Sequence, residues 1–411
     1  MTPRNNYGNS EWKLVALLTA LFGIVGLDRL VIVYLFPVLI PELKLNNTQA
    51  GAIASVLALT WAISTWALGS ISDKYGRKPI LIGSAIFFSA MTSVTGIAKS
   101  FFGLLGVRAL LGIGEGGVFS SSVAIISEIS TPRRRGLNLG IHQSFFPLLG
   151  IGLGPIIATQ LVMHMHWQWV FFVLGIPGLV LTYMIGRRMR GFPSAPHSEN
   201  TSKAIDGPLS VFRFRNIWLT TLIGVMFQTA LFVFSTFVAL YLTKKGMSLG
   251  DAGYIISGWG FGGFIGMIAL PAMSDRIGRK QALVLAAALY GILMLAFVLV
   301  HETPMQMFIN LFAAGICGFG IAPLFLSIIP CESVPRHLAG SAVGVTTAIG
   351  ELVGGVAMPI VAGGLADAYG LTYPMMIVGV ASLAIALVAA FLQETTRSPA
   401  SFPTPSAPDA A

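Results

Sequence analysis

Charged residues are scarce in this sequence. Only 10% of its 411 residues are Asp, Glu, Lys or Arg, whereas a soluble globular domain carries about 25%. Hydrophobic residues make up 55% of the chain and the mean hydropathy is +0.80. The apolar residues come in runs of about 20, the length that a helix needs to cross a bilayer. The composition therefore excludes a water-soluble globular protein and predicts a polytopic membrane protein.

Cysteine is equally scarce. The two cysteines, Cys317 and Cys331, lie within or at the end of one apolar run, so the chain has no disulfide framework and no metal-ligand spacing. The sequence also offers no pairing of a nucleophile with a base. We therefore predict that the protein is not an enzyme and that it needs neither a metal nor another cofactor.

Hydropathy and helix-breaking residues predict twelve membrane-spanning helices. The predicted ranges are 14–38, 49–72, 79–98, 102–127, 137–161, 167–186, 217–243, 252–273, 281–300, 306–329, 339–363 and 371–393. A β-barrel would show short alternating segments instead of these long apolar runs. The expected fold class is an all-α membrane protein with twelve transmembrane helices.

The net charge of +9 has a topological explanation. If the amino terminus is cytoplasmic, nineteen of the basic residues fall on the cytoplasmic side, and only Lys44, Lys99, Lys244 and Lys245 fall on the other side. Cytoplasmic loops of membrane proteins carry this excess of Lys and Arg. We expect both termini and the central loop to be cytoplasmic, and we expect no nucleic-acid partner.

The sequence contains an internal repeat. Residues 72–78 (SDKYGRK) recur as residues 274–280 (SDRIGRK), with an offset of 202 residues. The segment 187–216, rich in Pro, Ser and charge, separates the two copies. We predict an N-terminal six-helix bundle (1–186), a cytoplasmic linker loop (187–216), a C-terminal six-helix bundle (217–393) and a disordered cytoplasmic tail (394–411).

The repeated loop places an acid before a tight turn and an arginine after it. Such a loop can be a simple turn that obeys the charge bias of the cytoplasmic face. Its recurrence in both halves favours a switchable contact instead, made and broken as the halves rock. The candidate gating residues are Asp73, Arg77, Glu128 and Arg133 in the first half, and Asp275, Arg279, Glu332 and Arg336 in the second.

These features carry a resemblance to a known family. Residues 69–78 (GSISDKYGRK) resemble the loop signature of the major facilitator superfamily between helices two and three, and residues 274–280 resemble its counterpart between helices eight and nine. The resemblance covers essentially the whole chain. It implies a secondary transporter built from two parallel six-helix repeats, and it leaves the substrate open.

Four ionisable residues lie within predicted spans of the first half: Asp28, Arg29, Arg108 and Glu115. Arg108 and Glu115 are seven residues apart, which places them on one helix face about 10 Å apart. The four charges can form a network that only orients helices. Alternatively, an arginine in a low-dielectric cavity binds a carboxylate of the substrate, and a neighbouring acid exchanges protons.

The second half offers neutral polar candidates and one acid. Gln228, Tyr241 and Asn310 are candidate substrate contacts there, and Gln143 is a further candidate near the cytoplasmic side of span five. Glu351 is the acid that lies deep in the second half. It can serve as a second proton-coupling site, or it can stay protonated and bond within the bundle.

The intramembrane charges carry a second, narrower resemblance. Asp28-Arg29 and residues 108–115 (RALLGIGE) resemble the anion:cation symporter family, proton-coupled carriers of organic and sugar-acid anions. The resemblance implies that Arg29 binds the anion, that Asp28 and Glu115 take up protons, and that Arg108 holds Glu115 or the substrate. The same pattern also resembles the spinster-like lipid transporters.

Two transport hypotheses follow. The first is proton-coupled uptake of a small organic anion by alternating access, in a monomer whose partners are the anion, protons and the lipid bilayer. The alternative is a proton-coupled exporter of an amphipathic lipid or drug. A receptor or static scaffold has no use for two matched switch loops. The compact architecture favours the inner membrane of a bacterium.

Overall fold

The computed structural model describes residues 8–131, 134–189, 208–300, 303–335 and 338–395. Most of the predicted linker, most of the predicted tail, Arg133 and Arg336 therefore lie outside the described residues. Within the described ranges the chain is built from helices, and twelve helical spans are long and apolar enough to cross a membrane.

The helices follow the predicted order of spans. Their bounds are α1 Gly8–Leu43, α2 Asn47–Tyr75, α3 Arg77–Thr95, α4 Phe101–Ile129, α5 Arg135–Phe145, η1 Phe146–Leu153, α6 Gly154–His164, α7 Trp167–Arg188, η2 Pro208–Arg213, α8 Arg215–Lys244, α9 Leu249–Ile277, α10 Arg279–Leu299, α11 Pro304–Pro323, η3 Leu324–Ile328, α12 Ile329–Ser333, α13 Ala339–Gly350, η5 Glu351–Ala357, α14 Met358–Tyr369 and α15 Thr372–Ala389. Every predicted span coincides with one of these helical stretches. Most helices run a few residues further at each end, because polar end residues continue the helix beyond the apolar run.

Three spans are composite. Spans five, ten and eleven each contain a π-helical segment, respectively η1, η3 and η5, between two α-helices. Pro155 is the second residue of α6, the helix that follows η1. Pro359 is the second residue of α14, the helix that follows η5. A proline has no N–H group to donate to the carbonyl of residue i−4, so the regular hydrogen-bond pattern is interrupted there. A π-helical turn beside the proline is one way in which the helix accommodates this interruption.

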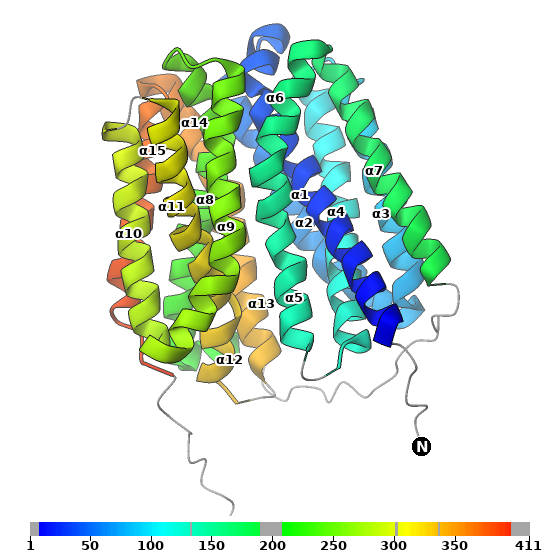
Figure 1. The fold of residues 1–411 in the computed structure, drawn as a ribbon, viewed down its shortest axis with the longest axis vertical. Helices are drawn as coiled ribbons and strands as arrows, with labels where there is room; N and C mark the ends of the chain where they lie inside the picture. The colour runs from blue at the N-terminus through cyan, green and yellow to red at the C-terminus, as the bar shows by residue number, and fades with distance from the viewer. Residues whose placement is uncertain (1–7, 132–133, 190–207, 301–302, 336–337, 396–411) are drawn as a thin grey trace, which may run out of the picture.

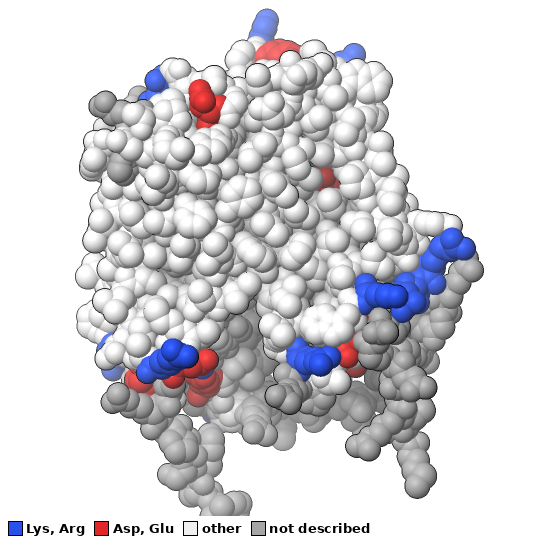
Figure 2. Space-filling model, viewed as in Figure 1, with Lys and Arg blue, Asp and Glu red and all other residues white. Residues whose placement is uncertain are grey.

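The helices form two groups that lie side by side. In Figure 1, α1 to α7 stand on the right and α8 to α15 on the left, and the spans run from one end of the molecule to the other, with α1 and α7 visibly inclined. Figure 2 shows that charged side chains gather at these two ends on the visible face, with an almost uncharged belt between them. This belt is the surface that a bilayer would cover.

One end of the molecule is strongly basic. We call it the basic face; its described Lys and Arg residues are Lys13, Lys74, Arg77, Lys78, Arg134, Arg135, Arg187, Arg188, Arg213, Arg215, Arg276, Arg279 and Lys280. Helix α1 begins there. At the opposite face, where α1 ends, the basic residues are Lys44, Lys99, Lys244 and Lys245.

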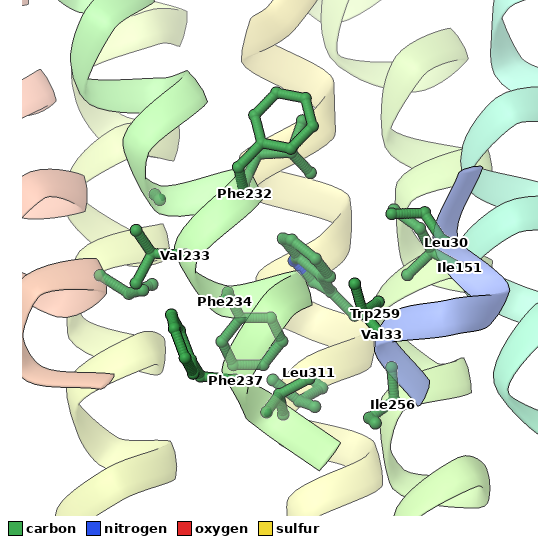
Figure 3. Packing of buried hydrophobic residues seen from close by; sticks show 14 of the residues in the cluster. Leu30, Val33, Ile151, Phe232, Val233, Phe234, Phe237, Ile256, Trp259 and Leu311 are labelled. Atoms are coloured by element: carbon green, nitrogen blue, oxygen red, sulfur yellow. The ribbon is translucent and has the colours of Figure 1, made fainter. Parts of the chain in front are cut away.

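The largest hydrophobic cluster joins the two groups of helices. Figure 3 shows Leu30 and Val33 of α1 and Ile151 of η1 facing Phe234 of α8 and Trp259 of α9. Small residues let the backbones approach closely here, because a Cβ on Gly260 of α9 would come within 2.5 Å of the Cα of Gly152 in η1. The hydrophobic core therefore extends through the interface between the groups.

A second junction between the groups lies at the opposite face. Asp367, near the end of α14, accepts hydrogen bonds from the first turn of α2: from the backbone and side-chain nitrogens of Asn47 at 2.9 and 2.8 Å, and from the backbone nitrogen and hydroxyl of Thr48 at 2.9 and 2.6 Å. A carboxylate is favourable at a helix N-terminus, where backbone N–H groups lack partners. Asp367 thus caps a helix of the other group.

We expect Asp367→Ala to loosen this junction. The amides of Asn47 and Thr48 lose their acceptor, so their hydrogen–deuterium exchange should accelerate about tenfold, the effect of losing about 1.4 kcal/mol. Asp251→Ala is the matched control, because the carboxylate of Asp251 accepts a hydrogen bond from the Ser248 hydroxyl at 2.7 Å and its backbone nitrogen donates to that hydroxyl at 3.0 Å, both within one helix start. Unchanged exchange at the start of α2 in Asp367→Ala would show that the cap does not hold the junction.

Candidate functional site

A buried ion pair joins the two groups of helices near the middle of the membrane-spanning region. Arg29 of α1 donates from Nη2 to Oε1 of Glu351, the first residue of η5, at 2.6 Å, and the two side chains are only 7% and 4% exposed. The other carboxylate oxygen of Glu351 accepts a hydrogen bond from the side-chain amide of Gln228 on α8. Arg29 is thereby tied to two helices that lie more than 190 residues away in sequence.

Aromatic rings cover the guanidinium of Arg29. Its Cζ lies 5.1 Å from the ring centroid of Trp61 on α2 and 4.9 Å from that of Phe232 on α8. Both contacts are cation–π interactions, which gain strength where water is excluded. The rings come from the two groups of helices, so the charge of Arg29 is held at their interface and only its N–H groups remain for a carboxylate.

Arg108 makes contacts that the sequence did not indicate. The family resemblance implied that it holds Glu115 or the substrate. In the structure its Nη1 donates to the backbone oxygen of Asp28 at 3.1 Å and its Nη2 to that of Arg29. The side chain is 1% exposed. A helix carbonyl keeps a second lone pair that a guanidinium can use. Arg108 therefore fixes the segment of α1 that presents Asp28 and Arg29.

Asp28 and Glu115, the two acids beside the buried arginines of the first half, are fully enclosed. Oδ2 of Asp28 accepts a hydrogen bond from the Thr92 hydroxyl of α3 at 2.8 Å. Both carboxylate oxygens of Glu115 are buried and accept no hydrogen bond from the described residues. Glu115 interacts electrostatically with Arg29 and Arg108, and Asp28 interacts with Glu115 and Arg108. Asp28, Arg29, Arg108, Glu115 and Glu351 form one electrostatic unit, which we call the central cluster.

The central cluster has an odd charge balance. It contains three carboxyl groups, those of Asp28, Glu115 and Glu351, and two guanidinium groups, those of Arg29 and Arg108. Full ionisation would leave one negative charge without a partner, and such a charge costs several kcal/mol inside a membrane-spanning bundle. A single proton on one carboxyl group neutralises the cluster.

The backbone of span eleven positions Glu351. The π-helical segment η5 begins at Glu351 and contains Gly354 and Gly355. A Cβ on Gly354 would come within 2.6 Å of the backbone nitrogen of Thr229, and one on Gly355 within 2.9 Å of the Phe232 ring. These glycines allow η5 to lie directly against α8. The close approach and the altered helical register together turn Glu351 toward Arg29.

The other predicted substrate contacts are more dispersed. Tyr241 is buried and its hydroxyl donates to the backbone oxygen of Val298 at 3.3 Å, so it lies between α8 and α10. Asn310 is buried on α11, which packs mainly against α9 and α10. Gln143 is exposed on α5. Of the predicted contacts in the second half, Gln228 is therefore the one that the structure brings to Arg29 through Glu351.

Trp61, Phe232 and Thr92 were not singled out in the sequence. The chain has 27 phenylalanines and seven tryptophans, so an aromatic residue in an apolar run gives no signal of a contact with arginine. Thr92 likewise resembles the other hydroxyl residues of the spans, most of which bond to their own helix backbone.

The repeated loops form matching contacts at the basic face. Arg77 lies 3.2 Å from Asp73 and 2.5 Å from Glu128, and Arg279 lies 2.5 Å from Asp275 and 3.2 Å from Glu332. Each arginine thus joins the loop to the end of α4 or α12 in its own half. The side chains of the two aspartates remain 62% and 63% exposed.

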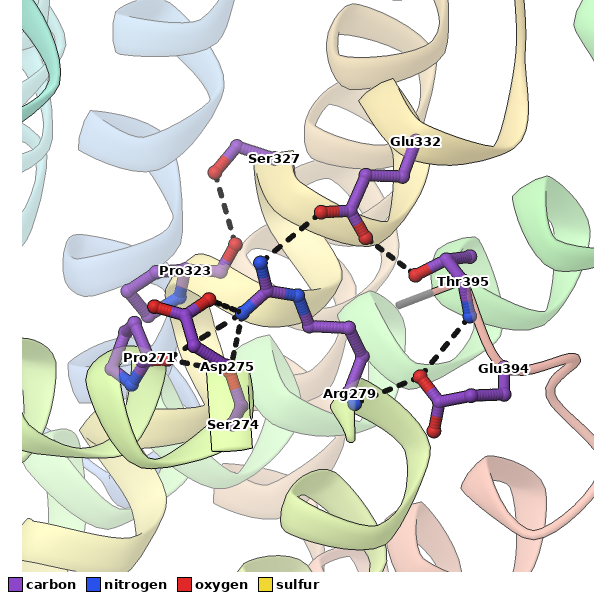
Figure 4. A network of polar contacts seen from close by, with 9 residues as sticks. All are labelled: Pro271, Ser274, Asp275, Arg279, Pro323, Ser327, Glu332, Glu394 and Thr395. Atoms are coloured by element: carbon purple, nitrogen blue, oxygen red, sulfur yellow. Dashed lines mark hydrogen bonds and ion pairs between the residues drawn. The ribbon is translucent and has the colours of Figure 1, made fainter. Parts of the chain in front are cut away.

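The second of these networks is the larger. Figure 4 shows Arg279 between Asp275 and Glu332, with its backbone nitrogen donating to Glu394 at 2.9 Å. Glu332 in turn accepts a hydrogen bond from the Thr395 hydroxyl. The segment after α15 is thereby tied to the repeated loop, which the sequence did not indicate because residues 394–411 were predicted to be a disordered tail.

Comparisons with known proteins agree with this architecture. A family model described as Major Facilitator Superfamily matches residues 18–358. The chain is 26% identical over 330 residues to a probable 4-methylmuconolactone transporter of Cupriavidus pinatubonensis, covering 78% of this chain and 76% of that protein. It is 27% identical over 388 residues to a sialic acid transporter of Escherichia coli, covering 91% and 92%.

A solved structure has a similar fold. It is the crystal structure of a bacterial homologue of the human lysosomal transporter Spinster in an inward-facing and occupied conformation. The TM-score is 0.74 at 19% sequence identity, and the match covers 94% of this chain and 97% of that one.

The buried pair makes a prediction about stability. Glu351→Leu leaves the guanidinium of Arg29 buried without its carboxylate, a loss of about 3–5 kcal/mol, so the melting temperature in detergent should fall by at least about 5 °C. The double variant Arg29→Met/Glu351→Leu replaces the pair with apolar side chains and should recover most of that loss. A double variant as unstable as the single one would contradict an ion pair between these residues.

Proposed function

We propose that this chain, which belongs to the Major Facilitator Superfamily, is a symporter that takes up a small organic anion together with a proton. The observation that carries the proposal is the buried pair of Arg29 and Glu351. In it a carboxylate of one half is already bound to a buried guanidinium of the other half. A substrate carboxylate can take the same place.

The names of the relatives support an organic substrate of this kind. One relative is named as a transporter of 4-methylmuconolactone and another as a transporter of sialic acid. Each covers more than three quarters of this chain, so the similarity extends into both halves. We infer a small organic acid as the substrate class.

Charge balance supplies the coupling. When the substrate carboxylate displaces Glu351 from Arg29, the displaced carboxylate is buried without a partner. The cluster then carries one negative charge more than before, and one additional proton restores neutrality. The proton binds to a carboxylate oxygen of Glu351, Asp28 or Glu115. One proton therefore accompanies each negative charge of the substrate, and transport of a monovalent anion is electrically neutral.

Alternating access follows from where the two halves touch. In this conformation they are joined at the opposite face by Asp367 and at mid-depth by Arg29 and Glu351. The repeated loops at the basic face bind within their own halves. We propose that this is the state open toward the basic face, and that Asp73 and Asp275 make contacts across the interface when the basic face closes.

The charge distribution supports the orientation. We propose that the basic face is cytoplasmic, because cytoplasmic loops carry the excess of Lys and Arg. Both termini then lie in the cytoplasm, and the protein acts as a monomer in the inner membrane of a bacterium. The two groups of helices, α1–α7 and α8–α15, move as the rocking halves.

A second candidate function is proton-coupled export of an amphipathic lipid or drug. The likeness in fold to the Spinster homologue favours it, and so do the aromatic rings of Trp61 and Phe232 on Arg29. The two functions differ in their need for Arg29. An anion requires its guanidinium, whereas an amphipathic cation or lipid would tolerate its loss.

The test uses purified protein in liposomes with a pH-sensitive dye inside. Sialic acid, 4-methylmuconolactone, benzoate, a hexuronate, a lysolipid and a cationic drug are added in turn. We expect one organic anion to acidify the lumen, and we expect Arg29→Ala to reduce the initial rate at least about tenfold, as loss of one charge-assisted contact of about 1.5–3 kcal/mol requires. Glu115→Gln should also reduce the rate, because it removes one ionisable carboxyl group from the central cluster. Lys99→Ala, at the opposite face, is the control.

Two outcomes would contradict the proposal. If only the lysolipid or the drug moves protons and Arg29→Ala still works, the export function takes its place. If an imposed membrane potential without a pH gradient drives uptake of a monovalent anion, the charge balance of the central cluster is not conserved and the one-proton coupling is wrong.

A further inference from the structure

A buried polar seam runs through the interior of the first half, away from the interface at which Arg29 lies. It is formed where α1, α4 and α5 meet. Its members, all buried, are Glu115 and Ser122 of α4, Ser130 at the end of α4, His142 and Asn138 of α5, and Glu11 of α1. The seam begins at the central cluster and ends at the basic face, where Glu11 is 7% exposed.

The order along the seam follows from helical spacing. Ser122 lies seven residues after Glu115, and Ser130 lies eight residues after Ser122, so all three share one face of α4. Each interval advances about 10–12 Å toward the basic face. On α5, Asn138 and His142 are one turn apart and face the same side. The polar side chains of α4 and α5 therefore meet at successive levels between the central cluster and the basic face.

Hydrogen bonds link the members in pairs. Nε2 of His142 lies 3.2 Å from the hydroxyl of Ser122, and the imidazole ring stacks on Phe22 with ring centroids 4.6 Å apart. The side-chain amide of Asn138 donates to the hydroxyl of Ser130 at 2.7 Å and to Oε1 of Glu11 at 3.1 Å. His142 is the titratable group between Glu115 and Glu11.

The seam contains buried polar atoms that lack a partner among the described residues. They are both carboxylate oxygens of Glu115, Nδ1 of His142 and Oδ1 of Asn138, and the hydroxyls of Thr19 and Ser121 lie on the same helices. Buried polar atoms are nearly always hydrogen-bonded, to protein or to water. Polar sites with several such atoms are where internal water resides.

Among the described residues of the second half, four of the seam's six positions have no hydrogen-bonding amide, hydroxyl, carboxyl or imidazole counterpart. Shifted by the repeat offset of 202 residues, Glu115 corresponds to Cys317, Ser122 to Leu324, Asn138 to Gly340 and His142 to Gly344. These residues occupy the matching helices α11, η3 and α13. Buried polar contacts of the second half such as that between Thr221 and Thr346 join uncharged side chains. The order acid, imidazole, acid of Glu115, His142 and Glu11 is therefore particular to the first half among the described residues, and it calls for a functional explanation.

We propose that the seam conducts protons between Glu115 and the basic face, with His142 as the relay. A neutral imidazole accepts a proton on one nitrogen and releases one from the other, so that no net charge stays on the ring. A proton leaving Glu115 passes through water and the Ser122 hydroxyl to Nε2 of His142. The proton released from Nδ1 passes through water beside Asn138 to Glu11 and to solvent.

The proposal rests on the proton coupling proposed above and adds a separate route to it. The substrate moves between the halves, along the interface that Arg29 and Glu351 close, whereas the proton leaves through the interior of the first half. Loss of the relay therefore slows deprotonation of the central cluster on the basic side. It leaves the binding of the anion and the reorientation of the loaded protein intact.

The test compares two modes of transport in liposomes. The probe is a radiolabelled anion that the wild-type protein transports, and sialic acid and benzoate are tried first. Net uptake driven by a pH gradient requires the proton to leave the protein in every cycle. Exchange of labelled for unlabelled anion at equal pH does not. The variants are His142→Phe, which retains an aromatic ring against Phe22, and Asn138→Leu, which interrupts the seam nearer the basic face.

We expect both variants to lower net uptake at least tenfold and to keep exchange within twofold of wild type. Ser382→Ala, a change of a buried serine on α15 in the second half, should leave both modes unchanged. A parallel fall of uptake and exchange would show that His142 is only a packing residue, and unchanged net uptake would show that protons take another route. Wild-type protein that moves anion without protons would overturn the proposed coupling itself.

Discussion

The ion pair between Arg29 and Glu351 is the contact on which the organisation of this protein depends. It crosses the interface between the two halves inside an apolar bundle, and its two members are 322 residues apart in the chain. A charge pair in such a place is costly to desolvate, and apolar side chains would stabilise the interface to a similar extent, so stability alone does not explain it. The pair can be exchanged during transport, because the carboxylate of a substrate can replace that of Glu351 at the guanidinium of Arg29.

The surrounding structure holds one side of this contact still and lets the other turn. Arg108 binds the carbonyl groups of Asp28 and Arg29, so the α1 segment is fixed to α4 within the first half. Glu351, by contrast, stands at the start of a π-helical segment in a span interrupted by glycine and proline. Such segments recur at functional sites because their register can change. A rigid arginine facing a carboxylate on a deformable helix suits a site that must open and close.

Much of this organisation could be predicted from the sequence. Apolar runs of 20 residues define the spans, and charges such as Arg29 and Glu115 stand out within those runs because they are costly there. The partner of Arg29 could not be predicted, because nothing local to Glu351 indicates which of the other eleven spans it faces. The hydrogen bonds of Arg108 to backbone carbonyl groups could not be predicted either, since every residue carries such a group. The cap that Asp367 forms on α2 depends in the same way on tertiary packing.

The central claim is that an anion binds by displacing Glu351 from Arg29, and that the central cluster takes up a proton when this happens. Proton uptake on binding can be measured directly, with a pH indicator in weakly buffered detergent solution to which the transported anion is added. Displacement predicts uptake of about one proton per monovalent anion bound. Binding of the anion without proton uptake in wild-type protein would contradict the displacement of a buried carboxylate and the charge balance of the central cluster.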